Sequence, residues 1–269
     1  MFIYIRNIHN TPTHSIKSPN NFTTPPPIPS NIVLLNSPPP PQHHSHELDQ
    51  RHIHRLRLHR LCLPYHRLSS GYTFAVKSTD ASRLLPLQNK ARVLSSLDST
   101  HIVGYRGDAA SPAGRPVFNL FLEYVPAGSL SNVIRKRGTL EEVAIAWYAR
   151  QILVGLDYLH SRGIVHCDVK PSNILVGSGD CVKIANFGCS KRVEAAPIAI
   201  RGTPKYMAPE AACGAEQGCP ADIWAFGCTI IEMATGKFPW TGVCDPVSAI
   251  HKIVYSGQSP EIPSRLSAH

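Results

Sequence analysis

The distribution of glycine and proline divides the sequence at residue 71. None of the 18 glycines precedes Gly71, whereas 11 of the 24 prolines lie in residues 1–70, some of them in runs such as Pro38–Pro41. Proline lacks the backbone N–H and disfavours the helical conformation of the residue before it, so this stretch cannot sustain a regular helix or sheet. Its remaining residues are mostly polar and bury too little apolar surface to offset chain entropy. We therefore expect residues 1–70 to be a disordered Pro/His-rich basic segment and a folded domain to occupy residues 71–269.

The positive charge follows the same division. Residues 1–70 carry 7 Lys and Arg against 2 Asp and Glu, and residues 71–269 carry 20 against 16, so more than half of the net charge of +9 lies in the first quarter of the chain. A domain that binds nucleic acid needs one strongly basic face, and this balance weighs against such a partner for the folded part. The run from Arg51 to Leu61 fits a patch for nucleic acid or a membrane surface, or a solvated tail, which we favour.

Cysteine usage and the N-terminus bear on the compartment. The eight cysteines form no C-x-x-C pair, and a chain of 269 residues needs no disulfide staples, which favours a reducing intracellular compartment. The five apolar residues at the N-terminus are too few for a signal peptide, and no stretch approaches the roughly 20 apolar residues that span a bilayer. We expect a soluble cytoplasmic protein, with the nucleus as a second location and no membrane contact.

Hydrophobic patterns after Gly71 predict strands first and mostly helices later. The predicted strands are 72–77, 116–124, 174–176 and 182–184, and the predicted helices are 84–97, 142–160 and 223–234. Thr139 and Glu142 have the spacing of a capping box, which is expected to open the helix that runs to about His160. This order of elements predicts an α+β fold in two lobes.

Five motifs follow one another over about 150 residues. They are Phe74-Ala-Val-Lys77, His166-Cys-Asp-Val-Lys-Pro-Ser-Asn173, Asn186-Phe-Gly188, the stretch Gly202–Glu210, and Asp222-Ile-Trp-Ala-Phe-Gly227. The second motif has the catalytic-loop pattern His-x-Asp-x-x-x-x-Asn of protein kinases, and the third stands where that family has Asp-Phe-Gly. The chain from Gly71 onward therefore resembles a eukaryotic protein serine/threonine kinase, and Lys170, two residues after Asp168, matches the Ser/Thr signature of that family.

Finer details resemble the plant MAP kinase kinase kinases of the MEKK type. These details are His-Cys-Asp at 166–168, Phe-Gly-Cys-Ser-Lys at 187–191 and the stretch from Glu232 to Trp240. The resemblance implies a small lobe over 71–124 and a large lobe over 126–269. It also implies a signalling enzyme that uses ATP and Mg²⁺ to phosphorylate serine or threonine in a protein substrate, with a MAP kinase kinase as the candidate substrate.

The resemblance also implies roles for the motif residues in phosphoryl transfer. Asp168 would accept the hydrogen bond and the proton of the substrate hydroxyl, and Lys170 would hold an oxygen of the γ-phosphate. Lys77 would contact the α- and β-phosphates. Asn173 and Asn186 stand at the positions that hold Mg²⁺.

The adenine site is implied in the same way. The carbonyl of Glu123 and the N–H of Val125 would bond the adenine edge, with Leu122 guarding the pocket. Ala75 and Leu175 would enclose the ring from its two faces. The side chains of Leu122, Ala75 and Leu175 are equally compatible with an ordinary hydrophobic core.

Both ends of the matched region depart from the family pattern. Gly71 is the only glycine in the 30 residues before Lys77, so the Gly-rich phosphate loop is absent, and we expect two strands of the small lobe to be absent with it. At the other end the sequence stops at His269, before the last helices of the family. We expect Glu210 to lack the arginine with which that family pairs it.

Two single positions depart as well. Lys90 stands thirteen residues after Lys77, where the family has the glutamate that pairs with this lysine. Two like charges about 4 Å apart repel by about 4 kcal/mol at an effective dielectric near 20, so either the helix swings outward or Lys77 takes another partner. Asn186 replaces the metal-binding aspartate and brings no negative charge, although Mg²⁺ is usually held by one or two carboxylates.

Three hypotheses follow. The intact Asp168, Lys170, Asn173 and Lys77 favour an active kinase, whose activity the departures would impair. Lys90 and Asn186 favour a pseudokinase, that is, a binding module with the same fold and no phosphoryl transfer. The change in composition at Gly71 favours a decayed kinase gene, or a wrongly assigned exon that supplies residues 1–70.

Overall fold

A computed structural model describes residues 63–66, 73–80, 84–110, 117–194, 200–240, 242–243 and 245–267, all within one compact unit, Glu47–His269. The disorder expected for residues 1–62 lies outside the described residues, as does Gly71.

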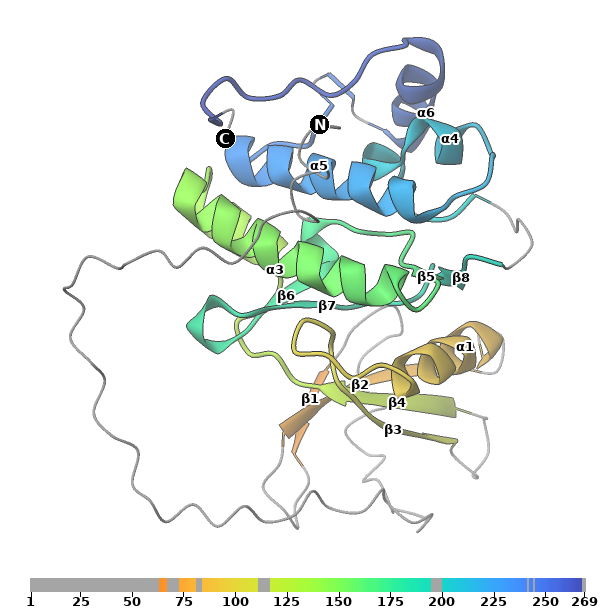
Figure 1. The fold of residues 1–269 in the computed structure, drawn as a ribbon. Coiled ribbons are helices and arrows are strands. Elements are labelled where there is room, and N and C mark those ends of the chain that lie inside the picture. Colours follow the sequence, from red (N-terminus) through yellow and green to blue (C-terminus); the bar gives the residue numbers. More distant parts are fainter. Residues whose placement is uncertain are drawn as a thin grey trace, which may run out of the picture. The chain divides into compact units, whose positions relative to one another are not determined.

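A four-stranded antiparallel sheet and one helix form the small lobe (Figure 1). The strands are β1 (Leu63–His66), β2 (Thr73–Asp80), β3 (Tyr105–Ala110) and β4 (Val117–Glu123), in the order β1-β2-β4-β3. The pairing of β2 with β4 sets Ala75 opposite Leu122 and Lys77 opposite Leu120. Because side chains alternate between the faces of a strand, these four residues share one face of the sheet. The two strands expected here are confirmed.

Strand β1 differs from the expectation. Residues 63–66 pair with residues 73–76, so regular structure begins before residue 71, and one of the two small-lobe strands expected to be absent is present. The strand is short and contains Pro64, which made its pattern weak. Its position at the edge of the sheet explains how proline is accommodated, because one side of an edge strand forms no ladder hydrogen bonds.

Helix α1 (Leu84–Ser95) packs against β3 and β4. Its buried residues Leu87, Ala91 and Leu94 recur at i, i+4 and i+7, which places them on one face of the helix. The helix ends two residues before the predicted end at Leu97, which packs partly buried against the same core. The helical pattern read from the sequence is therefore confirmed.

Helices dominate the rest of the described chain. The helices are α2 (Leu130–Arg137), α3 (Glu142–His160), α4 (Pro209–Ala212), α5 (Cys219–Thr235) and α6 (Pro246–Tyr255), with three short 3-10 turns at 171–173, 178–180 and 204–206. Two-stranded ladders join β5 (Ile164–Val165) to β8 (Lys191–Arg192) and β6 (Ile174–Val176) to β7 (Val182–Ile184). The strands expected at 174–176 and 182–184 have these bounds, and the helix expected at 223–234 lies within α5.

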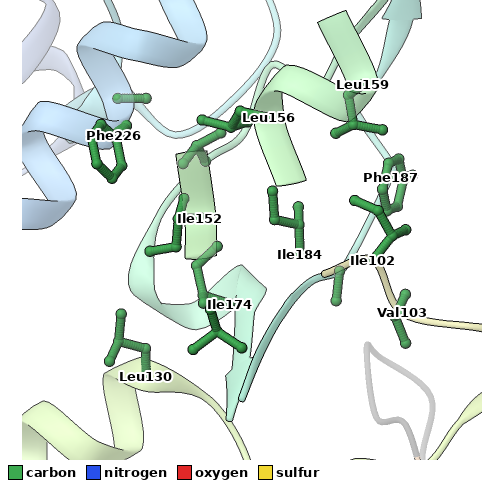
Figure 2. Packing of buried hydrophobic residues seen from close by; sticks show 14 of the residues in the cluster. Ile102, Val103, Leu130, Ile152, Leu156, Leu159, Ile174, Ile184, Phe187 and Phe226 are labelled. Atoms are coloured by element: carbon green, nitrogen blue, oxygen red, sulfur yellow. The ribbon is translucent and has the colours of Figure 1, made fainter. Parts of the chain in front are cut away.

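The main hydrophobic core is built around α3. Figure 2 shows Ile152, Leu156 and Leu159 of this helix among Ile174 and Ile184 of the β6–β7 ladder. All five side chains are at most 1% exposed. A smaller cluster joins α4, α6 and the segment after α5, and its buried members are Met207, Ala212, Trp240 and Ile253. None of the helices in the described part of the chain is long and apolar enough to cross a lipid bilayer.

The expected capping box at the start of α3 does not form. Glu141 is the N-cap residue and makes no capping hydrogen bond through its side chain. Leu140 is buried, and its N–H donates to the Met233 carbonyl at 2.9 Å, so contact with α5 fixes where α3 begins. The side chain of Glu142 instead accepts a hydrogen bond from the N–H of Ser267 at 2.9 Å.

Candidate active site

The loop that follows β5 is held by a single buried carboxylate. Asp222, on α5, accepts hydrogen bonds from the backbone N–H groups of His166 and Cys167, both at 2.8 Å. The Nε2 atom of His160, at the end of α3, lies 2.9 Å from the same carboxylate. Cys167 has a φ of 62°, a left-handed conformation that is uncommon outside glycine. Three partners on one carboxylate stabilise this turn and thereby set the direction of the residues that follow.

His166 joins this loop to the segment before Gly188. Its Nδ1 atom accepts a hydrogen bond from the N–H of Asp168 at 3.3 Å, so Nε2 carries the proton and donates to the Ala185 carbonyl at 3.0 Å. The ring is fully buried and meets the ring of Phe187 edge to face at 5.1 Å. The side chain of His166 therefore positions the second motif, which contains Asp168, relative to the third motif, which contains Phe187.

Asp168 accepts hydrogen bonds from three side chains. Its Oδ1 atom accepts from Lys170 Nζ at 3.1 Å and from Thr203 Oγ1 at 2.7 Å, and its Oδ2 atom accepts from Asn173 Nδ2 at 2.8 Å. Lys170 also donates to the Thr203 hydroxyl. The sequence motif predicted that Asp168, Lys170 and Asn173 come together, and the structure places them in contact.

A chain of hydrogen bonds continues from Asn173 to the small lobe. Asn186 Nδ2 donates to Asn173 Oδ1 at 3.0 Å, and Lys77 Nζ donates to Asn186 Oδ1 at 3.1 Å. Asn186 has a φ of 66°, a left-handed conformation in which asparagine is enriched. The chain thus brings Lys77, Asn186, Asn173 and Asp168 together across the two lobes.

The residues at the expected magnesium position fit a divalent cation poorly. Each of the two amide oxygens, on Asn173 and Asn186, already accepts a hydrogen bond, and the ammonium group of Lys77 stands 3.1 Å from one of them. The carboxylate of Asp168 is already engaged by its three partners. In the described part of the chain no group of three or more His, Cys, Asp and Glu side chains could hold a metal ion. Because Mg²⁺ is a hard cation that favours carboxylates, this donor set does not suit it.

Lys90 reaches the same segment from α1. A Cβ atom added to Gly188 would lie 2.7 Å from Lys90 Nζ and 3.6 Å from Asn186 Oδ1. Lys90 also partly offsets the rise in the pKa of the Cys189 thiol that burial causes. The sequence predicted that lysine at position 90 would either push the helix outward or leave Lys77 with another partner. The structure has the new partner, since Lys77 bonds Asn186.

The nearby thiols add no negative charge. Burial raises the pKa of Cys167 to about 12, and the carboxylate of Asp222 adds to the rise. Burial, followed by the charge of Asp168, also raises the pKa of Cys189. Both thiols therefore stay protonated near neutral pH and are poor metal ligands, because the thiolate is the form that binds metal.

The residues expected around adenine lie at the end of β4 and in β2 and β6. Ala75 and Leu122 face each other across β2 and β4, and both are buried. Leu175 is partly buried against the same hydrophobic cluster. Glu123 ends β4, and two residues later the N–H of Val125 has no hydrogen-bond partner among the described residues. An unpaired N–H beside apolar side chains is the arrangement that an adenine edge could use.

The side chain of Glu123 has a structural task of its own. Its Oε2 atom accepts from the N–H of Gly104 at 3.0 Å and lies 3.1 Å from Lys183 Nζ. The backbone N–H of Glu123 donates to the carbonyl of Gly104 at 2.8 Å. These contacts tie β4 to the loop before β3 and to β7.

Several contributors were not assigned roles from the sequence. Thr203 and Asp222 stood inside quoted motifs, but nothing in the motifs gave their partners, and His160 carried no signal at all. Gly202 was also given no role from the sequence. It has a φ of 108°, and a Cβ added to it would lie 2.4 Å from the carbonyl oxygen of Cys167. Only glycine allows the segment that carries Thr203 to approach the loop this closely.

Comparison with known proteins agrees with this geometry. The family described as protein kinase domain matches residues 63–266. Mitogen-activated protein kinase kinase kinase 18 of Arabidopsis thaliana is 47% identical over 209 residues, which cover 74% of this chain and 62% of the relative. Mitogen-activated protein kinase kinase kinase 17 of the same plant is 45% identical over 208 residues, which cover 74% of this chain and 55% of the relative.

A more distant relative is mitogen-activated protein kinase kinase kinase 3 of Mus musculus, 38% identical over 189 residues, which cover 68% of this chain and 30% of the relative. The chain thus spans less than two thirds of the length of each of these relatives.

Proposed function

The chain belongs to the protein kinase family, and on that basis we propose that it is a serine/threonine kinase of the MAP kinase kinase kinase type whose phosphoryl transfer is strongly attenuated. The observation that carries the proposal is the chain of hydrogen bonds from Lys77 to Asp168 through two asparagines. It brings the residues needed for transfer into contact, yet it contains a single carboxylate.

The proposed roles follow from the contacts. Adenine lies against Ala75, Leu122 and Leu175, with the N–H of Val125 as donor. Asp168 accepts the hydrogen bond and then the proton of a serine or threonine hydroxyl of the protein substrate, a MAP kinase kinase by analogy with the relatives. Lys170, which already touches Asp168, neutralises charge on the transferred phosphate as it develops.

Attenuation follows from charge. Members of the family generally use ATP with Mg²⁺, and metal ions neutralise the charge that develops on the β- and γ-phosphate oxygens. Asn186 offers an amide dipole where the aspartate of the family pattern would bring a full negative charge, and Asn173, as in that pattern, is neutral as well. Protein residues alone therefore have to orient the phosphates, and we expect slow turnover.

A second candidate is a pseudokinase in which the same site only binds. Lys90 favours it, because its ammonium group reaches the segment at Gly188 from the position where the family pattern has the glutamate of a Lys–Glu ion pair. We also propose a cytoplasmic location, with the nucleus as a second one.

A phosphoryl-transfer assay tests the first function. The full chain is incubated with labelled ATP, Mg²⁺ and a generic protein substrate rich in serine and threonine, beside the Asp168→Ala variant as a blank. We expect a low rate above that blank and a clearly higher rate in Asn186→Asp, because this change restores a carboxylate, the ligand that Mg²⁺ favours. If the unmodified chain and Asp168→Ala are indistinguishable, transfer is excluded and the binding function remains.

A further inference from the structure

Two cationic side chains flank Thr203, the residue that joins its segment to the proposed catalytic carboxylate. Thr203 Oγ1 donates to Oδ1 of Asp168 at 2.7 Å. Arg201 lies two residues before Thr203 and Lys205 two residues after it, and both residues are partly exposed. Because consecutive Cα atoms are 3.8 Å apart, neither Cα atom lies more than about 7.5 Å from that of Thr203. A substrate hydroxyl that reaches Asp168 therefore brings its neighbouring residues close to both cations.

The backbone of this segment is anchored on both sides of Thr203. Gly202 approaches the carbonyl oxygen of Cys167 so closely that an added Cβ would lie 2.4 Å from it. On the other side, the hydroxyl of Tyr206 donates to the buried carboxylate of Glu232. The fold therefore sets the positions of the two cations relative to the catalytic loop.

The ammonium group of Lys205 is held by an aromatic ring and by no carboxylate. It lies 4.1 Å from the centre of the Phe238 ring, a cation–π contact that positions the charge without neutralising it. Among the described residues no Asp or Glu lies within ion-pair distance of Lys205. The charge of Lys205 partly offsets the rise in the pKa of Glu232 that burial causes, but that carboxylate is buried and engaged by Tyr206.

The guanidinium group of Arg201 bonds main-chain oxygens. Its Nη1 atom lies 3.3 Å from the carbonyl oxygen of Cys189 and 3.4 Å from that of Ser190. In the part of the chain that the structure describes, Arg201 has no ion pair with a carboxylate either. A guanidinium carries five N–H donors in a planar fork that fits a carboxylate, and these contacts engage one of its three nitrogen atoms.

The charges of the catalytic loop do not cancel these two cations. Lys170 and Asp168 form an ion pair at 3.0 Å and largely neutralise each other. Arg201 and Lys205 thus remain as positive charges beside the place that the substrate hydroxyl takes. Such a surface attracts acidic side chains that flank the hydroxyl and repels basic ones.

We propose that this site selects serine and threonine residues flanked by acidic side chains, and that Arg201 and Lys205 select them. The inference rests on the proposed kinase function and deepens it by naming the class of protein segment that the site takes.

Binding of labelled peptides to the full chain, followed by fluorescence anisotropy, tests the selection. Each peptide has a central alanine in place of the acceptor, flanked on both sides by glutamates, glutamines or lysines, so that binding is measured without transfer. We expect the glutamate peptide to bind most tightly and the lysine peptide most weakly. Lys205→Met and Arg201→Met should each weaken binding of the glutamate peptide roughly two- to fivefold, the range of an exposed ion pair.

Lys136→Met is the matched control, since it removes an exposed lysine on α2 and should leave binding unchanged. The double variant Arg201→Glu with Lys205→Glu should bind the lysine peptide more tightly than the glutamate peptide, a reversal that loss of folding cannot produce. Thermal unfolding checks that each variant is folded, and Lys205→Gln serves if Lys205→Met is not.

The same peptides with a central serine are then incubated with the chain, labelled ATP and Mg²⁺. Fastest transfer to the glutamate peptide would support the selection. Absence of transfer to all three, with the order of binding unchanged, would refute the proposed kinase function and leave the selection of acidic segments standing. Equal binding of the glutamate and glutamine peptides would overturn the selection. Equal losses in Lys205→Met and Lys136→Met would also overturn it, because the overall positive charge of the chain would then account for the binding.

Discussion

Replacing Asp222 by asparagine is the substitution whose effect the structure predicts most directly. The carboxylate is buried and accepts from two backbone N–H groups at 2.8 Å, while Nε2 of His160 lies 2.9 Å from it. An amide has one acceptor oxygen. If that oxygen replaces Oδ2, which serves His166 and His160, the NH₂ group faces the N–H of Cys167 and leaves it without a partner.

The cost can be worked from these contacts. A buried donor that loses its partner costs about 1–3 kcal/mol, and the loss of the full negative charge weakens the two remaining bonds. We therefore expect Asp222→Asn to lower the free energy of unfolding by about 2–5 kcal/mol, a large part of the roughly 5–15 kcal/mol that holds a typical domain. The loop that carries Asp168 should lose its geometry with it.

Urea unfolding followed by tryptophan fluorescence measures this change. Asp157→Asn is the matched control, since Asp157 is exposed on α3 and its replacement should change stability by no more than about 0.5 kcal/mol. A loss below about 1 kcal/mol in Asp222→Asn, or equal losses in the two variants, would show that the carboxylate does not hold the loop.

Three further predictions concern the core. Ile152→Ala should lower the free energy of unfolding by about 2–5 kcal/mol, because Ile152 is fully buried. Val154→Ala, on the exposed side of the same helix, should cost far less. Similar losses for the two variants in chemical denaturation would contradict the packing. Gly155→Ala should lower the free energy of unfolding by about 1–3 kcal/mol, because the added Cβ would lie 2.8 Å from Cδ1 of Ile184. This loss is expected even though alanine is normally the better helix former. A higher melting temperature for the variant would refute this prediction. Burial raises the pKa of Glu232 above 4.5, so the stabilisation that its protonated form gives is complete below pH 4.5 and is lost as the pH rises through the raised value. The unfolding free energy of the unmodified chain should therefore fall over that interval relative to Glu232→Gln, and parallel pH curves would argue against it.

The sequence predicted several of the elements that local pattern decides, although β3, α2 and α6 were not predicted. The stripe of Leu87, Ala91 and Leu94 and the short strands at 174–176 and 182–184 depend on periodicity and on burial, which the residues themselves carry. The capping box expected at the start of α3 was wrong because a tertiary contact, from Leu140 to Met233, overrides the capping signal. Strand β1 was not predicted, since it is too short for its alternation to be recognised.

The candidate site divides in the same way, into residues that a local motif identifies and contacts that only the folded chain creates. The motifs supplied the identities of Asp168, Lys170 and Asn173, whose spacing keeps them close in any fold that contains this loop. The bond between Lys77 and Asn186 joins residues that are 109 positions apart, and no local pattern reports such a pair. The choice between an outward helix and a new partner for Lys77 therefore needed the structure.

The position of Asp222 in the chain also has a consequence for the order in which the protein folds. The carboxylate lies 56 residues beyond the backbone group of His166 that it binds. During synthesis, the loop from His166 to Asn173 therefore leaves the ribosome long before the residue that shapes it, and it can reach its final form only after α5 has docked. Contacts of such large sequence separation are slow to form, because the closure of the intervening chain has to come first. A nascent chain that ends before Asp222 would therefore carry every residue of the second motif without its working geometry.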